Sequence, residues 1–352
     1  MINKIFIILG NSCNLNCKYC VQHQLVHRHI KSKINEDIYS FIRIISKYKK
    51  LPIVFFGGEP LLYYPAIKEI VNNTKQYNVS YHIITNGLLL NREVITFFNL
   101  NKVGVAVSWD GNNTEQTRRY NIFKDINKIK SIIRLDSLSL SGVVTSYSYP
   151  KDILDSFQTI DNWYYQLHNK HIGVNLDLLI DTGLSDRVLY QFDFKKLEEQ
   201  SRYIIMQFIK DYTEKKETIY YLYGLSLLNR LLFSLKNPFT FEKCTCGNGH
   251  TVINLDLSGN LYSCHNISNS NGTIYDLENN LNLNKEIDPT SDFKDFCKEC
   301  KALPFCRGGC PLVTKERRED LYCKIRQTYF GSILDEITKN KNLLEELTFN
   351  SR

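Results

Sequence analysis

Short apolar runs alternate with amphipathic stretches along the first half of the chain. Runs typical of buried strands occupy residues 4–9, 52–56, 79–85, 103–108, 140–145 and 172–179. Amphipathic stretches typical of helices follow them, from residue 37 onward and over residues 66–77, 93–100, 122–133 and 153–167. Six strand-then-helix units predict an α/β fold, in which helices cover a parallel sheet.

Polar and glycine-rich segments follow the first four predicted strands. A cysteine-bearing loop follows the first strand and Gly57-Gly58-Glu59-Pro60 follows the second. Asn86-Gly87 ends the third, and Ser108-Trp109-Asp110-Gly111 ends the fourth. Because parallel sheets bind ligands at the carboxyl ends of their strands, we expect these segments to share one face.

The second half of the chain has a different pattern. Residues 194–235 are predicted to be helical, and a boundary is expected at Asn237-Pro238, beyond which glycine, asparagine and cysteine replace long helices. Residues 251–257 and 260–262 predict a hairpin through Ser258-Gly259. The expected domains are residues 1–180, a helical bridge over 181–238, a cysteine-rich domain over 239–330 and a C-terminal helix or tail over 331–352.

Composition and charge limit the classes of molecule that the chain is expected to bind. The chain has 352 residues, 43% of them hydrophobic, which suffices for a sizeable core. Its net charge of +7 and pI of about 8.7 are lower than is typical of a nucleic-acid-binding domain. Binding of an acidic partner is still compatible with this charge. No apolar run approaches the ~18 residues of a membrane span, and the run at residues 5–9 is too short for a signal peptide. We therefore expect a cytoplasmic protein that engages neither membrane nor nucleic acid.

The eleven cysteines fall into two groups. Three lie near the N-terminus and eight lie in the last third: Cys13, Cys17 and Cys20, then Cys244, Cys246, Cys264, Cys297, Cys300, Cys306, Cys310 and Cys323. Cytoplasmic thiols stay reduced, the number is odd and the spacings are tight. Metal ligation therefore explains them better than disulfides do.

The first group reads C-N-L-N-C-K-Y-C, which places three thiolates within eight residues. Such a loop can bind three irons of a [4Fe–4S] cluster and leave the fourth iron for another ligand. The alternative is a zinc site with His23 as a fourth ligand.

This motif, with Tyr19 in its aromatic position, resembles the signature of the radical S-adenosylmethionine (SAM) superfamily. The resemblance implies a partial (β/α)6 TIM-like barrel, and a reduced cluster that cleaves SAM to a 5′-deoxyadenosyl radical. Gly57, Gly58, Glu59 and Pro60 resemble the family's SAM-amine motif, Ser108 resembles a SAM contact, and Arg118 or Arg119 resembles the partner of the SAM carboxylate. Thr85 and Asn86 are SAM contacts or simply a turn.

The second group resembles the SPASM domain, a loop-rich C-terminal extension that holds two auxiliary clusters. The resemblance rests on Gly259-x4-Cys264 followed by C-x2-C-x5-C-x3-C and a last cysteine. It implies one auxiliary cluster on Cys246, Cys264 and Cys310, with Cys244 as fourth ligand or free, and a second cluster on Cys297, Cys300, Cys306 and Cys323. The alternative is a structural zinc site. With SAM, the implied cofactors are three [4Fe–4S] clusters.

Family members of this build modify ribosomally made precursor peptides or sulfatases. The resemblance favours peptide maturation, in which hydrogen abstraction leads to a C–C or thioether cross-link. The implied partners are the precursor peptide and an electron donor such as flavodoxin or ferredoxin. Because the sequence starts at the first barrel strand, a separate leader-peptide recognition protein is expected, or else direct docking of the peptide.

Anaerobic sulfatase maturation, which oxidises Ser or Cys to formylglycine, is the second hypothesis. Relatives with that activity carry an Asp where this chain has His265, which is either a catalytic base or a surface residue. A third hypothesis, a zinc-binding adaptor without activity, explains the cysteines but leaves Gly57–Pro60 and Ser108 unexplained.

Overall fold

The chain groups into two compact units that each draw on distant parts of the sequence. The computed structural model describes residues 2–25, 33–183, 185–237, 246, 251–279 and 297–340. The first unit comprises residues 1–109, 118–141 and 243–288, and the second comprises 110–117, 142–242 and 289–352. The domains expected over 1–180, 181–238, 239–330 and 331–352 follow chain order and stay a prediction.

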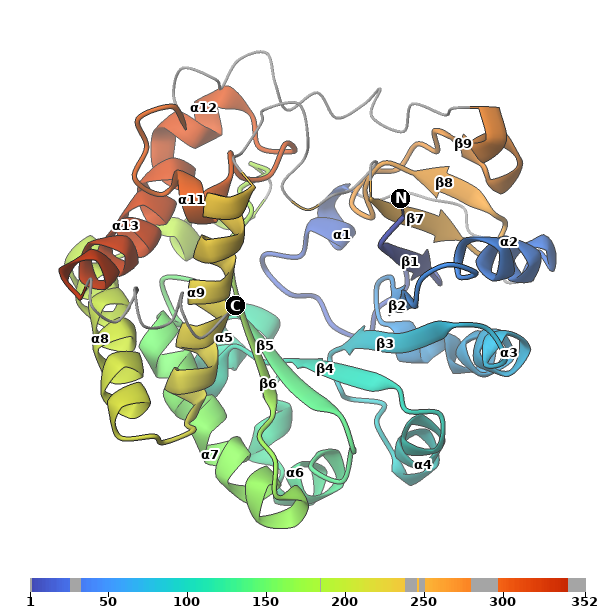
Figure 1. Cartoon of the computed structure of the whole chain (residues 1–352), viewed down its shortest axis with the longest axis horizontal. Helices are drawn as coiled ribbons and strands as arrows, with labels where there is room; N and C mark the ends of the chain where they lie inside the picture. The colour runs from blue at the N-terminus through green and yellow to red at the C-terminus, as the bar shows by residue number, and fades with distance from the viewer. Residues whose placement is uncertain are drawn as a thin grey trace. The chain divides into compact units, whose positions relative to one another are not determined.

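The first unit is built on a mainly parallel sheet (Figure 1). Its strands lie in the order β5-β4-β3-β2-β1-β7-β8-β9, with parallel pairing from β5 to β7 and antiparallel pairing beyond. Their bounds are β1 Lys4–Ile8, β2 Leu51–Phe56, β3 Val79–Thr85, β4 Gly104–Ser108, β5 Leu138–Val144, β7 Val252–Asp256, β8 Asn260–Tyr262 and β9 Gly272–Thr273. The strand order has two open ends, so the α/β fold with an unclosed parallel sheet is confirmed.

Apart from α1, which was not predicted, the helices of this unit follow their strands as the periodicity predicted. They are α1 Val21–Leu25, α2 Asp37–Ile45, α3 Tyr64–Thr74, α4 Arg92–Leu100 and α6 Ile126–Ile132, with short 3-10 turns at Pro60–Tyr63, Ile122–Lys124 and Ile274–Asn279. The helix expected over residues 122–133 is interrupted at Asp125, which has an extended backbone. Its carboxylate accepts hydrogen bonds from the amides of Asn127 and Lys128 and so starts α6.

The two faces of this sheet differ in burial. One face is fully buried and carries Ile5, Ile7, Ile53, Phe55, Ile83, Val105, Val107 and Leu140. Helices α2, α3 and α4 lie on one side of the sheet (Figure 1). The opposite face is buried at Ile8 and Val54 and half-buried at seven further positions: Phe6, Phe56, Ile84, Ala106, Ser108, Ser139 and Ser141. We call these seven residues the open face.

β7 joins this sheet from far along the sequence. The predicted hairpin forms, because β7 and β8 pair antiparallel with Asn254 opposite Tyr262. Gly259 has a φ of +86° in the turn, a conformation that favours glycine. The parallel pairing of β7 with β1, from Lys4 opposite Val252 to Ile8 opposite Asp256, was not predicted from the sequence.

The second unit is mostly helical. It contains the last residues of β5 (142–144), β6 Gly173–Leu178 and the helices α7 Pro150–His168, α8 Phe194–Thr213, α9 Ile219–Lys236, α11 Leu303–Cys306, α12 Lys315–Arg317 and α13 Cys323–Lys339. Short 3-10 turns cover Gly111–Asn113 and Arg187–Tyr190. The remaining helix, α5 Thr114–Arg118, begins in this unit and ends in the first.

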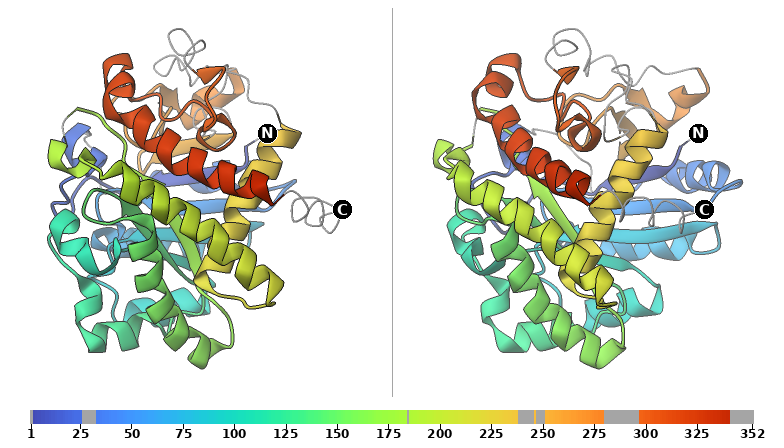
Figure 2. Two further views of the ribbon diagram at one scale, coloured as in Figure 1. Left: turned by 90° about the vertical axis from the view of Figure 1, so that its left-hand side faces the viewer. Right: turned by 60° about the vertical axis from the view of Figure 1, so that its left-hand side comes forward.

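Helices α8, α9 and α13 pack together in this unit (Figure 2). The hydroxyls of Tyr223 in α9 and Tyr329 in α13 are 2.6 Å apart. A π-helical turn over Arg318–Tyr322 connects α12 to α13. π-Turns inside helices are rare and frequently mark functional sites.

Within the described residues, no helix is both long enough and apolar enough to cross a bilayer.

Candidate functional site

Cys13, Cys17 and Cys20 lie together in the loop that follows β1. Cys13 is exposed, and Cys17 and Cys20 are half-buried and not in disulfides. The Cys20 amide donates to the Cys17 carbonyl at 3.2 Å. The sulfurs of Cys13 and Cys20 accept backbone hydrogen bonds from Leu15 and His23, both at 3.4 Å. The predicted triad is therefore a compact loop whose thiols reach solvent.

The Gly57–Pro60 segment packs against this cysteine loop. The Gly58 amide donates to the Gly10 carbonyl at 2.9 Å, and the Glu59 amide donates to the Ser12 carbonyl at 2.8 Å. A Cβ at position 58 would lie 2.3 Å from the Ser12 carbonyl oxygen. Glycine is thus required because the two loops approach each other closely, a reason the sequence did not reveal.

Glu59 connects the ends of β2 and β3. Its side chain is 1% exposed and accepts hydrogen bonds from the Leu61 amide at 3.0 Å, the Thr85 hydroxyl at 2.6 Å and the Asn86 amide at 2.8 Å. Burial raises the pKa of this carboxyl group, and these three hydrogen bonds oppose the rise. In this structure the Glu59 carboxylate and the Thr85 hydroxyl thus hydrogen-bond to each other and to backbone amides of the protein.

Asn86 extends this network to the cysteines. Its side-chain amide donates to the Asn14 oxygen at 2.7 Å and lies 4.0 Å from the Cys13 sulfur. Burial raises the pKa of the Cys13 thiol, the Leu15 hydrogen bond lowers it, and the charge of Glu59 raises it further. Because cluster ligands are thiolates, binding of iron here displaces a proton.

Ser108 and Arg118 belong to the same unit as the cysteine loop, and Ser108 lies on the open face opposite Ser141 of β5. The Arg118 guanidinium carbon lies 5.3 Å from the centroid of the Tyr19 ring, next to Cys20. Arg119 is exposed and has a φ of +66°. Of the two predicted arginines, the contact with the cysteine loop is therefore made by Arg118.

His265 packs against two aromatic residues of the open face. Its ring centroid lies 4.9 Å from that of Phe6 and 4.5 Å from that of Phe56. Its Nδ1 is 3.3 Å from the Asn254 side-chain oxygen. The side-chain amide of Gln22, in α1, donates to the His265 carbonyl and, at 2.8 Å, to the Asn266 side chain. His265 thus lies beside the open face and is tied to the helix after Cys20.

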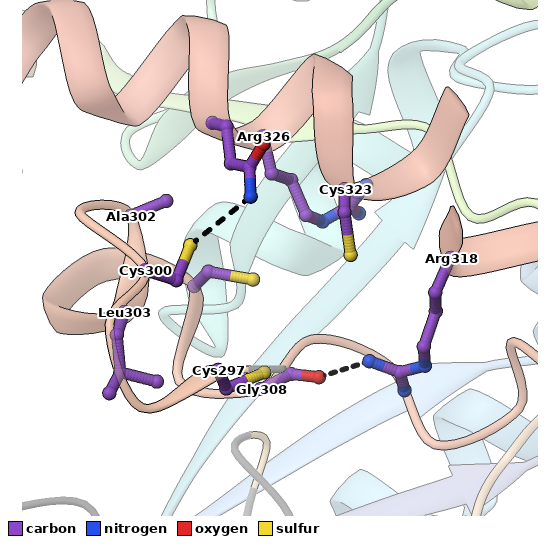
Figure 3. Close-up of a pocket in the computed structure, with 10 residues that line it drawn as sticks. Cys297, Cys300, Ala302, Leu303, Gly308, Arg318, Cys323 and Arg326 are labelled. Atoms are coloured by element: carbon purple, nitrogen blue, oxygen red, sulfur yellow. Dashed lines mark hydrogen bonds between the residues drawn. The ribbon is translucent and has the colours of Figure 1, made fainter. Parts of the chain in front are cut away.

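Four cysteines of the second unit line one pocket (Figure 3). They are the four that the SPASM resemblance assigns to one auxiliary cluster: Cys297, Cys300, Cys306 and Cys323. Ala302, Leu303, Gly308, Arg318, Arg326 and Gln327 complete its wall. Cys323 is the first residue of α13 and Cys306 the last of α11, so helix ends hold two of the four thiols.

Burial disfavours the charged form of these thiols. It raises the pKa of Cys297 and Cys306, and it raises the pKa of Cys323 to about 11. The Arg318 and Arg326 guanidinium groups act in the opposite direction on Cys306 and Cys323. Across the part of the chain that the structure describes, no three Cys, His, Asp or Glu side chains are arranged to hold a single metal ion. Four thiols around one pocket suit a cluster, in which each thiolate binds a different iron.

The described ones among the remaining predicted ligands do not line that pocket. Cys246 and Cys264 belong to the first unit, where Cys246 is exposed and Cys264 is buried. Cys310 belongs to the second unit, where its amide donates to the Tyr322 hydroxyl at 2.6 Å. Cys244 lies outside the described residues.

Sequence reasoning missed several residues of these sites. Gln22, Asn254 and Tyr322 carry no motif, and Arg318 and Arg326 read as ordinary charges of a helix surface. The one available signal for the arginines was their position on either side of Cys323.

Comparisons with known proteins show what the chain is similar to. The model of the Radical SAM superfamily matches residues 7–146. The radical SAM cyclopropyl synthase TigE of Paramaledivibacter caminithermalis is 24% identical over 333 residues, covering 88% of this chain and 68% of that protein. A cysteine-type anaerobic sulfatase-maturating enzyme of Clostridium novyi is 25% identical over 366 aligned residues, covering 94% of each chain.

Solved structures share the fold. Native anSMEcpe with bound AdoMet matches with a TM-score of 0.70 at 17% identity, over 99% of this chain and 100% of that one. Streptococcus suis SuiB bound to precursor peptide SuiA matches with a TM-score of 0.60 at 17% identity, over 89% of this chain and 72% of that one.

Proposed function

Because this chain belongs to the radical SAM superfamily, as an enzyme of its SPASM-type, peptide-modifying branch, we propose that it matures a ribosomally made precursor peptide. It would abstract a hydrogen atom from the peptide and form a C–C or thioether cross-link. The observation that carries this proposal is the open face of the sheet, which lies in the same unit as the cysteine loop and borders His265.

The residues of the first unit fit the cofactor of this family. Cys13, Cys17 and Cys20 would bind three irons of a [4Fe–4S] cluster, which supplies the electron for cleavage of SAM to a 5′-deoxyadenosyl radical. Around SAM we place Gly57, Gly58, Glu59, Pro60, Thr85, Asn86, Ser108 and Arg118, with Arg119 as a second choice for the carboxylate.

The chain's own residues prepare this site before any ligand binds. Glu59 holds the ends of β2 and β3 together, and Asn86 fixes the cysteine loop through Asn14. Ser108 and Ser141 present hydroxyls on the open face. Arg118 offers a fixed positive charge beside Tyr19, suited to a carboxylate.

Two auxiliary clusters complete the proposed cofactor set. Cys297, Cys300, Cys306 and Cys323 would hold one, which is supported by their shared pocket. Cys246, Cys264 and Cys310 would hold the other, with Cys244 as its fourth ligand. A flavodoxin or ferredoxin would supply electrons, and a separate recognition protein would deliver the leader peptide, in the cytoplasm, where thiols stay reduced.

A peptide substrate is supported by the structural relatives. The anSMEcpe structures include one with a bound Cp18Cys peptide, and SuiB is seen with its precursor peptide SuiA. On the open face, His265 would act as the base that accepts a substrate proton. Its contact with Asn254 would orient the ring for this role.

Sulfatase maturation is the second candidate, because the relatives named as sulfatase-maturating enzymes align over nearly the whole of both chains. The two candidates differ in their products. A cross-link joins two residues of one peptide, whereas formylglycine formation changes a single Ser or Cys.

The experiment uses reconstituted enzyme, SAM and a reductant with two substrates: a peptide encoded beside the gene, and a sulfatase segment. Mass spectrometry with fragmentation would show a cross-link in the first peptide and no change in the second. Formylglycine in the sulfatase segment would instead establish the second candidate. Cys17→Ala should abolish 5′-deoxyadenosine, whereas His265→Asn should retain it and lose product.

A further inference from the structure

We propose that Arg318 and Arg326 set the reduction potential of the auxiliary cluster held by Cys297, Cys300, Cys306 and Cys323. Their two fixed positive charges would stabilise the reduced cluster and so raise its potential. This inference rests on the proposed function, because it requires that the four thiolates bind a cluster.

Both arginines are buried at the wall of the cysteine pocket. Arg318 is 4% exposed and Arg326 is 7% exposed, and both line the pocket (Figure 3). A buried charge is costly to the fold unless another charge or strong hydrogen bonds compensate it. Both guanidinium groups lie where they favour negative charge in the same pocket, since both lower the pKa of Cys306 and Cys323.

Arg318 is held by the backbone of the cysteine loop. Its guanidinium group donates to the carbonyls of Val313 at 3.0 Å, of Cys310 at 2.6 Å and of Gly308. These three carbonyls fix the position of the guanidinium group at the pocket wall. Arg318 also begins the π-turn that ends one residue before Cys323.

Arg326 is held from the opposite side. Its guanidinium group donates to the carbonyls of Leu179 at 3.0 Å and of Leu178 and Tyr322 at 3.4 Å, and it stacks on the Tyr322 ring at 3.4 Å from the centroid. In the described part of the chain, no carboxylate forms an ion pair with Arg326.

Electrostatics gives the direction of the effect. Four thiolates make the bound cluster negative overall, and reduction adds one electron and one further negative charge. A fixed positive charge in a buried pocket attracts the reduced form more strongly than the oxidised form. The Gln327 side-chain amide, 3.7 Å from the Cys300 sulfur, acts in the same direction, since hydrogen bonds to the sulfurs and net charge both tune cluster potentials.

A raised potential makes this cluster an electron acceptor more than a donor. A cross-link that joins two peptide positions removes two hydrogens from the peptide. One leaves as the hydrogen atom taken by the 5′-deoxyadenosyl radical, and the other leaves as a proton plus an electron. The pocket of the second unit is suited to take up that electron in its oxidised cluster.

The test is a redox titration of full-length reconstituted protein, followed by the electron paramagnetic resonance signal of the reduced cluster. Cys17→Ala and Cys264→Ala in the background remove the other two signals. Arg318→Gln, Arg326→Gln and the double variant should each lower the fraction of reduced cluster at a given applied potential. For the double variant we expect the ratio of reduced to oxidised cluster to fall at least tenfold, which is about 59 mV for one electron.

Two variants serve as controls. Arg187→Gln makes the same change at an arginine of the second unit that is 61% exposed on its side chain and pairs with Asp320, and it should leave the potential unchanged. Arg326→Lys keeps the positive charge. Its ratio of reduced to oxidised cluster should stay within tenfold of that of the protein without this substitution.

The outcomes separate this inference from the proposed function. If Cys306→Ala fails to lower the iron content, the pocket holds no cluster and the proposed function is wrong at this site. If the cluster is present and the double Gln variant titrates like the parent, the charge-tuning inference is wrong. Should the Gln variants lose their iron, Arg326→Lys decides: a parental potential supports the inference, and a shift of tenfold or more overturns it.

Discussion

Single side chains fix the loops that carry the cysteines of this protein. Glu59 accepts three hydrogen bonds from the segments after β2 and β3, and Asn86 carries that network to the cysteine loop. In the second unit, Arg318 and Tyr322 bind the two backbone groups of Cys310. At both places a buried polar residue fixes the backbone that carries a thiol. These residues therefore position the cysteines.

The Cys323 thiol provides a test at the same scale. Its pKa is raised by burial to about 11, whereas a free cysteine has a pKa near ~8.5, and only the thiolate reacts with iodoacetamide. At pH 8 we therefore expect Cys323 of metal-free protein to react roughly a hundred times more slowly than an unperturbed thiol. The rate should increase with pH until about 11.

Timed quenching and peptide mass spectrometry would measure this rate, with the exposed Cys246 as internal reference. Equal rates for the two thiols at pH 8 would contradict the burial of Cys323. Since the folded state keeps a proton that the unfolded chain releases, the raised pKa also makes metal-free protein less stable as pH rises from about 8.5 to 11.

At the scale of elements, the strand-end segments pack on one another as tightly as backbone allows. Gly58→Ala would place a Cβ 2.3 Å from the Ser12 carbonyl oxygen. The cysteine loop must then move, at a cost of about 1–3 kcal/mol. We expect SAM binding and 5′-deoxyadenosine formation to fall more than tenfold, as measured by equilibrium binding and chromatography.

Gly331→Ala is the matched control, because a Cβ at that position of α13 meets no atom within 4 Å. In a helix interior this change should stabilise the protein by about 0.5–1 kcal/mol and leave SAM cleavage intact. Normal activity of Gly58→Ala would show that the contact between the two loops is dispensable.

The π-turn supports a further prediction at this scale. Tyr322→Phe removes the hydroxyl that accepts from the Cys310 amide, at a cost of about 1 kcal/mol. Reconstituted protein should then release iron to a chelator faster. Tyr329→Phe removes the hydrogen bond between the hydroxyls of Tyr329 in α13 and Tyr223 in α9. This control variant should lower stability similarly but change the iron-release rate little. Equal release rates in both variants would mean that Tyr322 does not fix Cys310.

Periodicity predicted these elements well where neighbours in sequence are neighbours in space. The six strands of the βα units and the hairpin of β7 and β8 were found, because alternation and turn residues encode them locally. The parallel partner of β1 was missed, since nothing local marks β7 as its neighbour. The resemblance to the SPASM domain grouped the four cysteines that line the pocket of the second unit, whereas Arg318 and Arg326 became visible only through their burial.

At the scale of the whole molecule, the thiols are divided between two units. The first unit contains Cys13, Cys17, Cys20, Cys246 and Cys264, and the second contains Cys297, Cys300, Cys306, Cys310 and Cys323. Each unit combines segments that are far apart in the sequence, so neither corresponds to a continuous stretch of chain.

Iron and sulfide analysis of protein reconstituted without oxygen tests this division. Three cubane clusters require about twelve irons and twelve sulfides per chain. Cys306→Ala should lower both values by about a third and spare SAM cleavage, since the cysteine loop after β1 is untouched. One or two zinc ions without sulfide would contradict the cluster assignments and support a structural zinc protein.

The pairing of β1 with β7 has a consequence for biosynthesis. β1 is synthesised well before its partner β7, which begins at Val252, about 240 residues later. At about 5–20 residues per second, one edge of β1 stays unpaired for roughly 10 to 50 seconds of translation. An uncovered strand edge invites pairing with other chains. That edge is therefore open to other chains during this interval, and the sheet behind the cysteine loop is complete only after residue 273 has been made.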